Sequence, residues 1–235
     1  MAYGAALGAC ARAGRWLQAQ GLLAELRRDL VEADVIMHGA AVRAYGKAGR
    51  WLRALGHLGE MGEVHVEPNL VAITGAITVC SNVLQWARAV ATLNSTQQAR
   101  VPLDLIAHNA ALDACARGQQ PGRAAAMLED MKGSRLQLDV LSFNTAISAG
   151  ERGSRWADAL RLAVALQTRG LRPDAVTCSA AVGACEEGRR WLQALELFDV
   201  LRGWYLEAEV VVQNSLASAC EKCQQWERSL DTLAE

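Results

Sequence analysis

The chain has 235 residues, of which 51% are hydrophobic, so it can bury a substantial core and is not expected to be disordered. Its formal net charge of −1 excludes a strongly basic protein that coats duplex nucleic acid through bulk charge, but not one with a local basic groove. Seven cysteines, an odd number, favour a reducing compartment over a secreted disulfide framework.

Two stretches imitate targeting or membrane segments. Residues 1–24 carry Arg12 and Arg15 and no acid, which loosely resembles an organelle transit peptide. Because these residues share the repeat described next, we assign them to the folded array. Residues 68–87 are uncharged, but they open with Pro68 and contain several polar amides and hydroxyls, so we reject a membrane span.

Tryptophan marks the period of the chain. Trp16 and Trp51 lie 35 residues apart, and four further tryptophans keep this spacing, with Pro121 at the one position that is skipped. A fixed period of this length indicates a solenoid of short supersecondary units. We interpret the tryptophans as packing residues between helices. The six members are Trp16, Trp51, Trp86, Trp156, Trp191 and Trp226.

Other residue types keep the same phase. A small residue follows each tryptophan position by three places, as the close approach of two helices requires: Ala19, Ala54, Ala89, Ala124, Ala159, Ala194 and Ser229. Five cysteines share one helical phase, which favours buried packing over redox or metal chemistry. They are Cys10, Cys80, Cys115, Cys185 and Cys220.

Within each period, two apolar runs with helical periodicity are separated by a short break, which five repeats mark with glycine. These glycines are Gly14, Gly49, Gly118, Gly153 and Gly188. The pattern predicts an all-α fold: one domain, residues 1–235, forming a right-handed α-solenoid of about seven 35-residue helix-turn-helix repeats. The expected repeats are 1–34, nearly complete, then 35–69, 70–104, 105–139, 140–174, 175–209 and a partial one at 210–235. A chain that starts and stops inside a repeat is expected to be a piece of a longer array.

Three segments identify a family resemblance. Residues 140–147 (VLSFNTAI), 108–117 (HNAALDACAR) and 168–174 (TRGLRPD) resemble the start and end of the pentatricopeptide repeat. The resemblance covers essentially the whole chain. The tetratricopeptide repeat fits less well, because its period is 34 and its tryptophan lies in the first helix. The tryptophan column departs from the leucine that is more usual in pentatricopeptide repeats.

The resemblance implies that each repeat reads one base of single-stranded RNA with two side chains. One lies in the first turn of the first helix: Gly4, Gly39, Thr74, Asn109, Asn144, Ser179 and Asn214. The other ends the repeat: Asp34, Asn69, Asp104, Asp139, Asp174 and Glu209. The second set has an alternative role, because Asp and Asn are also preferred N-caps of helices.

Two further columns have both a functional and a structural interpretation. A branched apolar residue opens each first helix, either as a wedge that stacks on bases, as the resemblance implies, or as ordinary helix packing: Ile36, Val71, Ile106, Leu141, Val176 and Val211. Basic residues recur near the end of the first helix: Arg12, Lys47, Arg117, Arg152 and Lys222. They either contact phosphates or stabilise the helix C-terminus through its dipole.

The family's reading rule, carried over repeat by repeat, predicts a short RNA sequence. Thr74 with Asp104 implies guanine, and the two asparagine–aspartate repeats each imply uracil with some preference over cytosine. Ser179 implies a weak purine preference, whereas Gly4 and Gly39 offer no side chain for reading. The predicted target is 5′-N-N-G-U-U-R-3′, in which R is the purine.

No motif for catalysis or cofactor binding is present. The chain lacks a phosphate-binding glycine loop, and Cys220-x-x-Cys223 has no second ligand pair for zinc. His57, Glu60, Glu63, His65 and Glu67 lie close in sequence, but such a charged helix end is usually solvated. We therefore expect no enzyme activity, no metal and no cofactor.

The function expected from the resemblance is occupancy of single-stranded RNA in processing, stability or translation, in a mitochondrion or plastid. The protein is expected to be monomeric, away from membranes, with possible protein partners in an RNA-processing complex. The alternative is a protein-interaction scaffold that binds a peptide in the same groove, which near-neutral charge and two glycines at reading positions favour.

Overall fold

A computed structural model describes residues 2–29, 33–63, 68–99, 101–134 and 136–202, together with residues 214, 217–219 and 221. Within residues 2–202, the described elements are all helices and include no strand. The helices are α1 (Ala2–Ala13), α2 (Trp16–Arg28), α3 (Val35–Lys47), α4 (Trp51–Glu63), α5 (Leu70–Asn82), α6 (Trp86–Gln98), α7 (Leu105–Arg117), α8 (Pro121–Gly133), α9 (Val140–Arg152), α10 (Trp156–Thr168), α11 (Ala175–Glu187) and α12 (Trp191–Arg202). The expected all-α repeat fold is confirmed.

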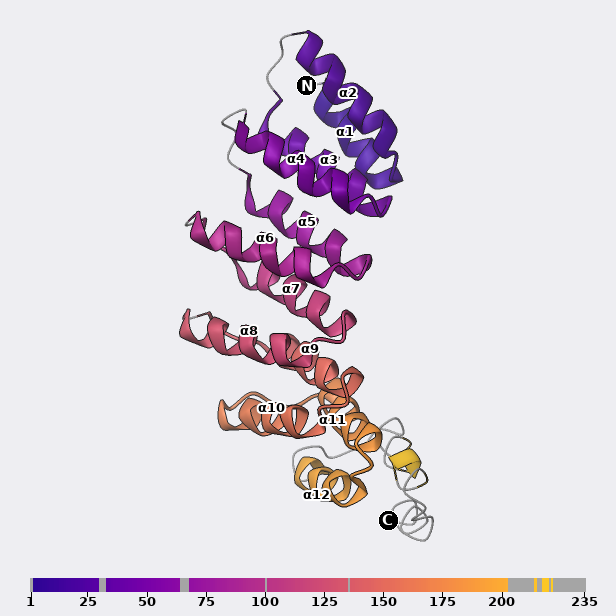
Figure 1. Ribbon diagram of the computed structural model, residues 1–235, viewed down its shortest axis with the longest axis vertical. Coiled ribbons are helices and arrows are strands. Elements are labelled where there is room, and N and C mark those ends of the chain that lie inside the picture. Colours follow the sequence, from indigo (N-terminus) through magenta and orange to yellow (C-terminus); the bar gives the residue numbers. More distant parts are fainter. Residues whose placement is uncertain are drawn as a thin grey trace. The chain divides into compact units, whose positions relative to one another are not determined.

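The chain forms two compact units, Met1–Ala114 and Cys115–Glu235. In the N-terminal unit the first helices of successive repeats form a row, because α1 packs on α3 and α3 packs on α5. In the C-terminal unit α9 packs on α11, and α10 contacts both of these helices. Figure 1 shows this alternation of first and second helices along the chain. Each helix pair therefore buries its apolar surface partly against the next repeat.

Local signals begin and end the first helices. Asp34, Asn69, Asp139 and Asp174 are N-caps with extended backbone, and each side chain accepts a hydrogen bond from an N–H in the first turn. At the other end of α3, the N–H of Arg50 donates to the carbonyl of Tyr45, a six-residue closure that recurs in the later repeats. These bonds satisfy backbone groups that a helix leaves unpaired at its ends.

Glycine serves two different purposes at the turn. One residue of each turn adopts a positive φ, and it is glycine only in the first two repeats: Gly14, Gly49, Leu84, Gln119, Ser154 and Arg189. Gly153 and Gly188 precede that position and have negative φ values of −97° and −78°. A Cβ at Gly188 would lie 2.5 Å from Cδ1 of Trp156, and one at Gly153 would overlap Pro121. The later glycines therefore allow close packing of consecutive repeats.

The repeated small and sulfur-bearing residues lie in the core. The alanines three places after the tryptophan position are buried from Ala19 to Ala194. Cys10, Cys80, Cys115 and Cys185 are buried free thiols, as their shared phase indicated. Burial raises the pKa of Cys80 to about 11, so this thiol is a packing group rather than a nucleophile. Cys220 and Cys223 lie outside the described residues.

The described tryptophans lie at the edge of this core rather than at its centre. Each is the first residue of a second helix and is half-buried. The guanidinium of Arg50 lies 5.1 Å from the ring centroid of Trp16, and that of Arg190 lies 4.9 Å from the ring of Trp156. The tryptophan thus stabilises the contact with the turn of the next repeat through packing and cation–π attraction. Trp226 lies outside the described residues.

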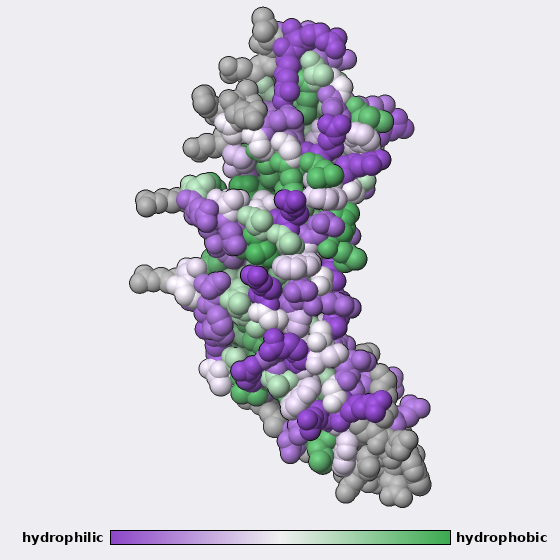
Figure 2. Space-filling model, in the orientation of Figure 1, coloured by the Kyte–Doolittle hydropathy of each residue, from purple (hydrophilic) through white to green (hydrophobic). Residues whose placement is uncertain are grey.

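The uncharged stretch 68–87 is divided between α5 and α6 by a turn at residues 83–85. No helix within the described ranges has both the length and the apolar character to cross a membrane. On the face shown in Figure 2, hydrophobic and hydrophilic side chains alternate in short patches.

Candidate nucleic-acid interface

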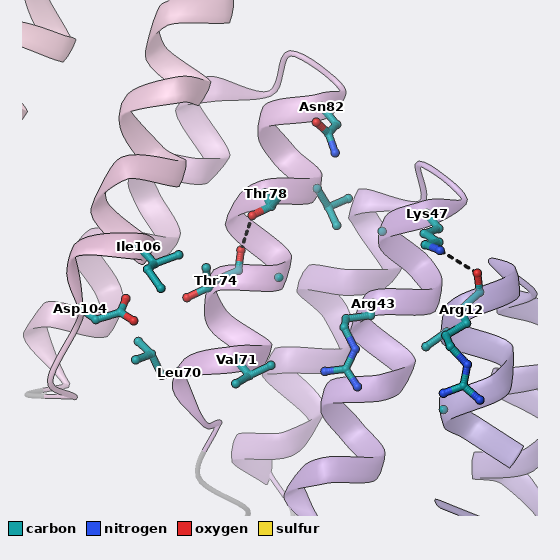
Figure 3. A pocket seen from close by; sticks show the side chains of 15 residues that line it. Arg12, Arg43, Lys47, Leu70, Val71, Thr74, Thr78, Asn82, Asp104 and Ile106 are labelled. Carbon is teal, nitrogen blue, oxygen red and sulfur yellow. Dashed lines mark hydrogen bonds between the residues drawn. The ribbon is translucent and has the colours of Figure 1, made fainter. Parts of the chain in front are cut away.

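A groove of about 600 Å³ runs across the first helices of the N-terminal unit. Its walls come from α1, α3, α5 and the start of α7 (Figure 3). It brings together members of all four columns singled out from the sequence: Thr74 and Asp104 from the two reading columns, two apolar wedges and two cations. These last four residues are Val71, Ile106, Arg12 and Lys47.

Thr74 carries an unsatisfied hydroxyl in this groove. Its Oγ1 is buried, and it is the single buried side-chain N or O atom in the described part of the chain that has no hydrogen-bond partner. Its carbonyl, by contrast, accepts a bond of 2.8 Å from Oγ1 of Thr78 (Figure 3). Leaving a buried hydroxyl unpaired costs about 1–3 kcal/mol, so the groove retains an unmet capacity to hydrogen-bond a ligand.

In the C-terminal unit a reading pair is joined directly. Nδ2 of Asn144 donates to both carboxylate oxygens of Asp174, at 2.9 and 3.1 Å, and Oγ1 of Thr177 donates to Oδ1 of Asn144 at 2.5 Å. Burial alone would raise the pKa of Asp174, but hydrogen bonds from Thr177 and Asn144 lower it overall. The carboxylate therefore fixes the orientation of the asparagine amide, which is buried.

The end-of-repeat residues cap the following helices, as the alternative interpretation of that column proposed. Their side-chain oxygens accept bonds of 2.8 or 2.9 Å from the backbone N–H groups of Met37, Ala72, Ala107, Ser142 and Thr177. Capping and base reading are compatible, because Asp174 caps α11 while it also contacts Asn144.

The remaining reading residues occupy equivalent places on the first helices. Gly39, Asn109 and Ser179 are the fifth residues of α3, α7 and α11, as Thr74 and Asn144 are of α5 and α9. Gly39 is buried, Gly4, Asn109 and Ser179 are half-buried, and Asn214 is exposed. Glu209, the partner expected for Ser179, lies outside the described residues.

The wedge residues are exposed, which ordinary helix packing does not explain. Ile36 is 71% exposed and Val71 is 53% exposed, although each is a large apolar side chain at the second position of its helix. Ile106, Leu141 and Val176 are similarly exposed. Such surface costs free energy in water and favours contact with another apolar or aromatic group. Val211 lies outside the described residues.

The basic column lies at the C-terminal ends of the first helices. Arg12, Lys47, Arg117 and Arg152 are all exposed there. Nζ of Lys47 donates a 2.6 Å bond to the carbonyl of Arg12, which supports the helix-terminus interpretation for this lysine (Figure 3). The other interpretation, contact with phosphates, applies to the exposed guanidiniums. Lys222 lies outside the described residues.

The sequence interpretation missed two features of this surface. Arg43 lines the N-terminal groove one helical turn after Gly39, and the i, i+4 spacing was the signal that could have found it. In the C-terminal unit, burial, and then the charges of Glu186 and Glu187, raise the pKa of Glu151, whereas Arg152 opposes the increase. The first helices are therefore cationic in the N-terminal unit and partly acidic in the C-terminal unit.

The fold and the groove define a helical-repeat protein whose first helices form a row in the N-terminal unit. Comparison with known proteins relates the N-terminal part of the chain to one family. The pentatricopeptide repeat domain matches residues 21–82, and the PPR repeat matches residues 1–29. Residues 1–82 therefore consist of pentatricopeptide repeats, and the later repeats share their 35-residue period. No curated protein matches it in sequence.

Solved structures of this family share the fold over nearly the whole chain. The pentatricopeptide repeat protein PPR10 from maize is 26% identical, with a TM-score of 0.74, over 97% of this chain. PPR10 in complex with an 18-nucleotide psaJ RNA element has a TM-score of 0.60 and 18% identity over 99% of this chain and 39% of its own. The chain spans only 33% of the first of these structures.

A third similar structure is the PPR domain of Arabidopsis thaliana protein-only RNase P 1, solved in complex with tRNA. It is 15% identical, with a TM-score of 0.62, over 80% of this chain and 95% of that domain. Both RNA-bound structures are similar to this chain in fold.

Proposed function

We propose that this protein binds single-stranded RNA along its first helices, with one base per repeat, and acts by occupying that RNA. The observation that carries the proposal is the groove of the N-terminal unit. There the unpaired Oγ1 of Thr74, the exposed wedges Val71 and Ile106 and the cation Arg12 line one cavity. A nucleotide offers a complementary group to each: a base edge, an aromatic face and a phosphate.

The wedges support a stacked arrangement of the bases. In the proposed complex each base lies between the exposed apolar residues of consecutive repeats, and the reading pair contacts its edge. Contact between the face of a base and an apolar side chain removes both from water and does not depend on the base sequence. The reading pairs then supply the selectivity.

The proposed core of the target is G-U-U. Thr74 with Asp104 is assigned to guanine, and Asn109 with Asp139 and Asn144 with Asp174 are assigned to uracil. The bond from Asn144 to Asp174 supports the last assignment, because it holds the asparagine amide in one orientation. Ser179 is assigned to a weak purine.

Selection of bound sequences from a random RNA pool at low salt tests this function. Enrichment of RNAs with a G-U-U core is expected. If no such RNA is enriched and a protein partner is recovered without RNA, the chain is instead a scaffold that uses the groove for a peptide. We also propose that the RNA is a mitochondrial or plastid transcript. Localisation of a tagged full-length protein in cells tests this part.

A further inference from the structure

Arg43 occupies the place of a missing reading side chain. Gly39 stands at the reading position of the repeat 35–69, so that repeat has no side chain of its own there. A Cβ at Gly39 would lie 3.8 Å from Nη1 of Arg43 and 4.0 Å from Oδ1 of Asn69. The guanidinium therefore lies beside the space that a reading side chain would fill, next to the end-of-repeat partner.

The geometry of the helix explains this placement. Side chains on an α-helix lean toward its N-terminus, so a long side chain at position i reaches over residue i−4. In Figure 3 the side chain of Arg43 extends toward the end of the groove where Val71 lies. Glycine at position 39 leaves the room that the guanidinium uses.

The guanidinium of Arg43 is available for a ligand. Other arginines are engaged: Arg27 bonds to Glu60, and Arg50 covers the ring of Trp16. Arg43 is exposed, and within the described ranges its side chain takes part in no ion pair or hydrogen bond. It lines the same cavity as the unpaired hydroxyl of Thr74.

We infer that Arg43 reads the base at the glycine repeat and selects guanine. An arginine fork donates two parallel hydrogen bonds to the adjacent acceptors O6 and N7 of guanine, which no other base offers. The inference rests on the proposed binding of RNA and extends its target to 5′-N-G-G-U-U-R-3′. The repeat 1–34 has Gly8 in the place that corresponds to Arg43, so its base is left unread.

Four synthetic RNAs that differ only at the nucleotide 5′ to the G-U-U core test the inference. We expect the native protein to bind the guanine RNA about five- to tenfold more tightly than the other three, from the usual contribution of such a pair. Arg43→Ala should abolish this preference. Arg43→Lys should also abolish it while keeping most of the affinity, because lysine retains the charge but lacks the fork.

Three outcomes would overturn it. Equal binding of the four RNAs by the native protein excludes a reading role. Equal weakening of all four by Arg43→Ala makes Arg43 a phosphate contact. A loss of preference in Arg88→Ala, an exposed arginine of α6 outside the groove, makes the effect nonspecific. If the four RNAs bind no better than one whose G-U-U core is replaced by cytidines, the proposed function itself fails.

Discussion

Two residues proposed to read bases, Asn144 and Thr74, differ in how their polar groups are satisfied. Asn144 is held by Asp174 and Thr177, so its amide is oriented before any ligand arrives. Thr74 has a buried hydroxyl without a partner. The oriented amide of Asn144 loses less conformational entropy when RNA binds. The hydroxyl of Thr74 gains a hydrogen bond only in the complex.

Thr74→Val separates the effect of the hydroxyl on base selection from its effect on the stability of the fold. Valine has the same shape and lacks the unpaired oxygen, so we expect the free energy of unfolding to stay constant or to rise by about 1 kcal/mol. The preference for guanine at that repeat should disappear. Urea unfolding and binding to RNAs that vary at this position measure the two effects. A destabilised variant would show that the hydroxyl has a partner in the folded protein.

Asp174→Ala removes a cap and a contact with Asn144, whereas Asp34→Ala removes a cap alone, since the paired residue there is Gly4. Loss of a cap costs about 1 kcal/mol, and a hydrogen bond to a charged group adds about 1.5–3 kcal/mol. We expect Asp174→Ala to be the more destabilising of the two in urea unfolding. Equal costs would argue that the bond between Asn144 and Asp174 adds nothing to stability.

At the scale of the helices, repeats are joined by contacts at their turns. Gly188 admits the ring of Trp156, Arg190 covers the same ring, and the pattern recurs where Arg50 covers Trp16. These contacts link the second helix of one repeat to the turn of the next. They explain why tryptophan, a large residue that is only half-buried here, keeps its phase along the chain.

Gly188→Ala should destabilise the C-terminal unit by about 1–3 kcal/mol, because the added Cβ displaces the ring of Trp156. Gly133→Ala, where an added Cβ meets nothing within 4 Å, should be neutral or stabilising by up to about 1 kcal/mol. Urea unfolding measures both. In a Trp156→Leu background the cost of Gly188→Ala should shrink; an unchanged cost would exclude the ring as its cause.

A buried histidine pair joins α3 and α4. Nδ1 of His38 lies 2.9 Å from Nε2 of His57, and the rings of Tyr45 and His57 pack in a T-shaped arrangement. Burial and then the neighbouring His38 lower the pKa of His57 to about 4, and Glu60 opposes this effect. Burial also lowers the pKa of His38, with Arg27 adding to the effect. Both rings are therefore neutral in the folded protein at neutral pH.

This pair makes the N-terminal unit sensitive to acid. A pKa below that of the unfolded chain means that the unfolded state binds the proton first, so stability is complete above about pH 6.5 and falls as the pH drops toward about 4. The loss should reach up to about 3 kcal/mol. Urea unfolding between pH 7 and pH 4 measures it. The double variant His38→Leu/His57→Leu should lose less stability over this range; an identical pH profile would contradict the assignment.

At the scale of the molecule, a net charge of −1 conceals an uneven distribution. Arg12, Arg43 and Lys47 line the groove of the N-terminal unit, whereas Glu151 and Glu186 lie on first helices of the C-terminal unit. Bulk charge thus gives no attraction for RNA, and any electrostatic contribution comes from local cations.

The salt dependence of RNA affinity measures how many of these cations contact phosphates. Phosphate contacts from all five residues of the basic column, Arg12, Lys47, Arg117, Arg152 and Lys222, would make log affinity fall against log salt with a slope of roughly −3 to −4, at about 0.7 per contact, and about −3 if Lys47 serves only the end of α1. Arg12→Ala should reduce the slope by about 0.7 and weaken all RNAs equally, whereas Arg88→Ala should leave it unchanged. A slope near zero would mean that the basic column serves only the helix ends.

Sequence reasoning predicted much of this fold, because its signals are local. The individual helices and the caps at Asp34 and Asp174 depend on residues within one or two turns of each other, and the 35-residue period is visible when repeats are compared. The reading and wedge columns were also visible, because a repeated phase identifies one face. The turn glycines were assigned a single role, although Gly14 supplies a positive φ and Gly188 supplies space.

The hydrogen bonding, position and burial of individual side chains could be determined only from the packed structure. The unpaired hydroxyl of Thr74, the reach of Arg43 over Gly39 and the burial of His57 against His38 all depend on which side chains of neighbouring helices come within a few ångströms. Hydrogen bonding and desolvation act over that distance, and sequence spacing does not measure it. The periodic sequence thus determines the repeats and their shared face, while contacts between repeats determine which groups on that face are left to bind a ligand.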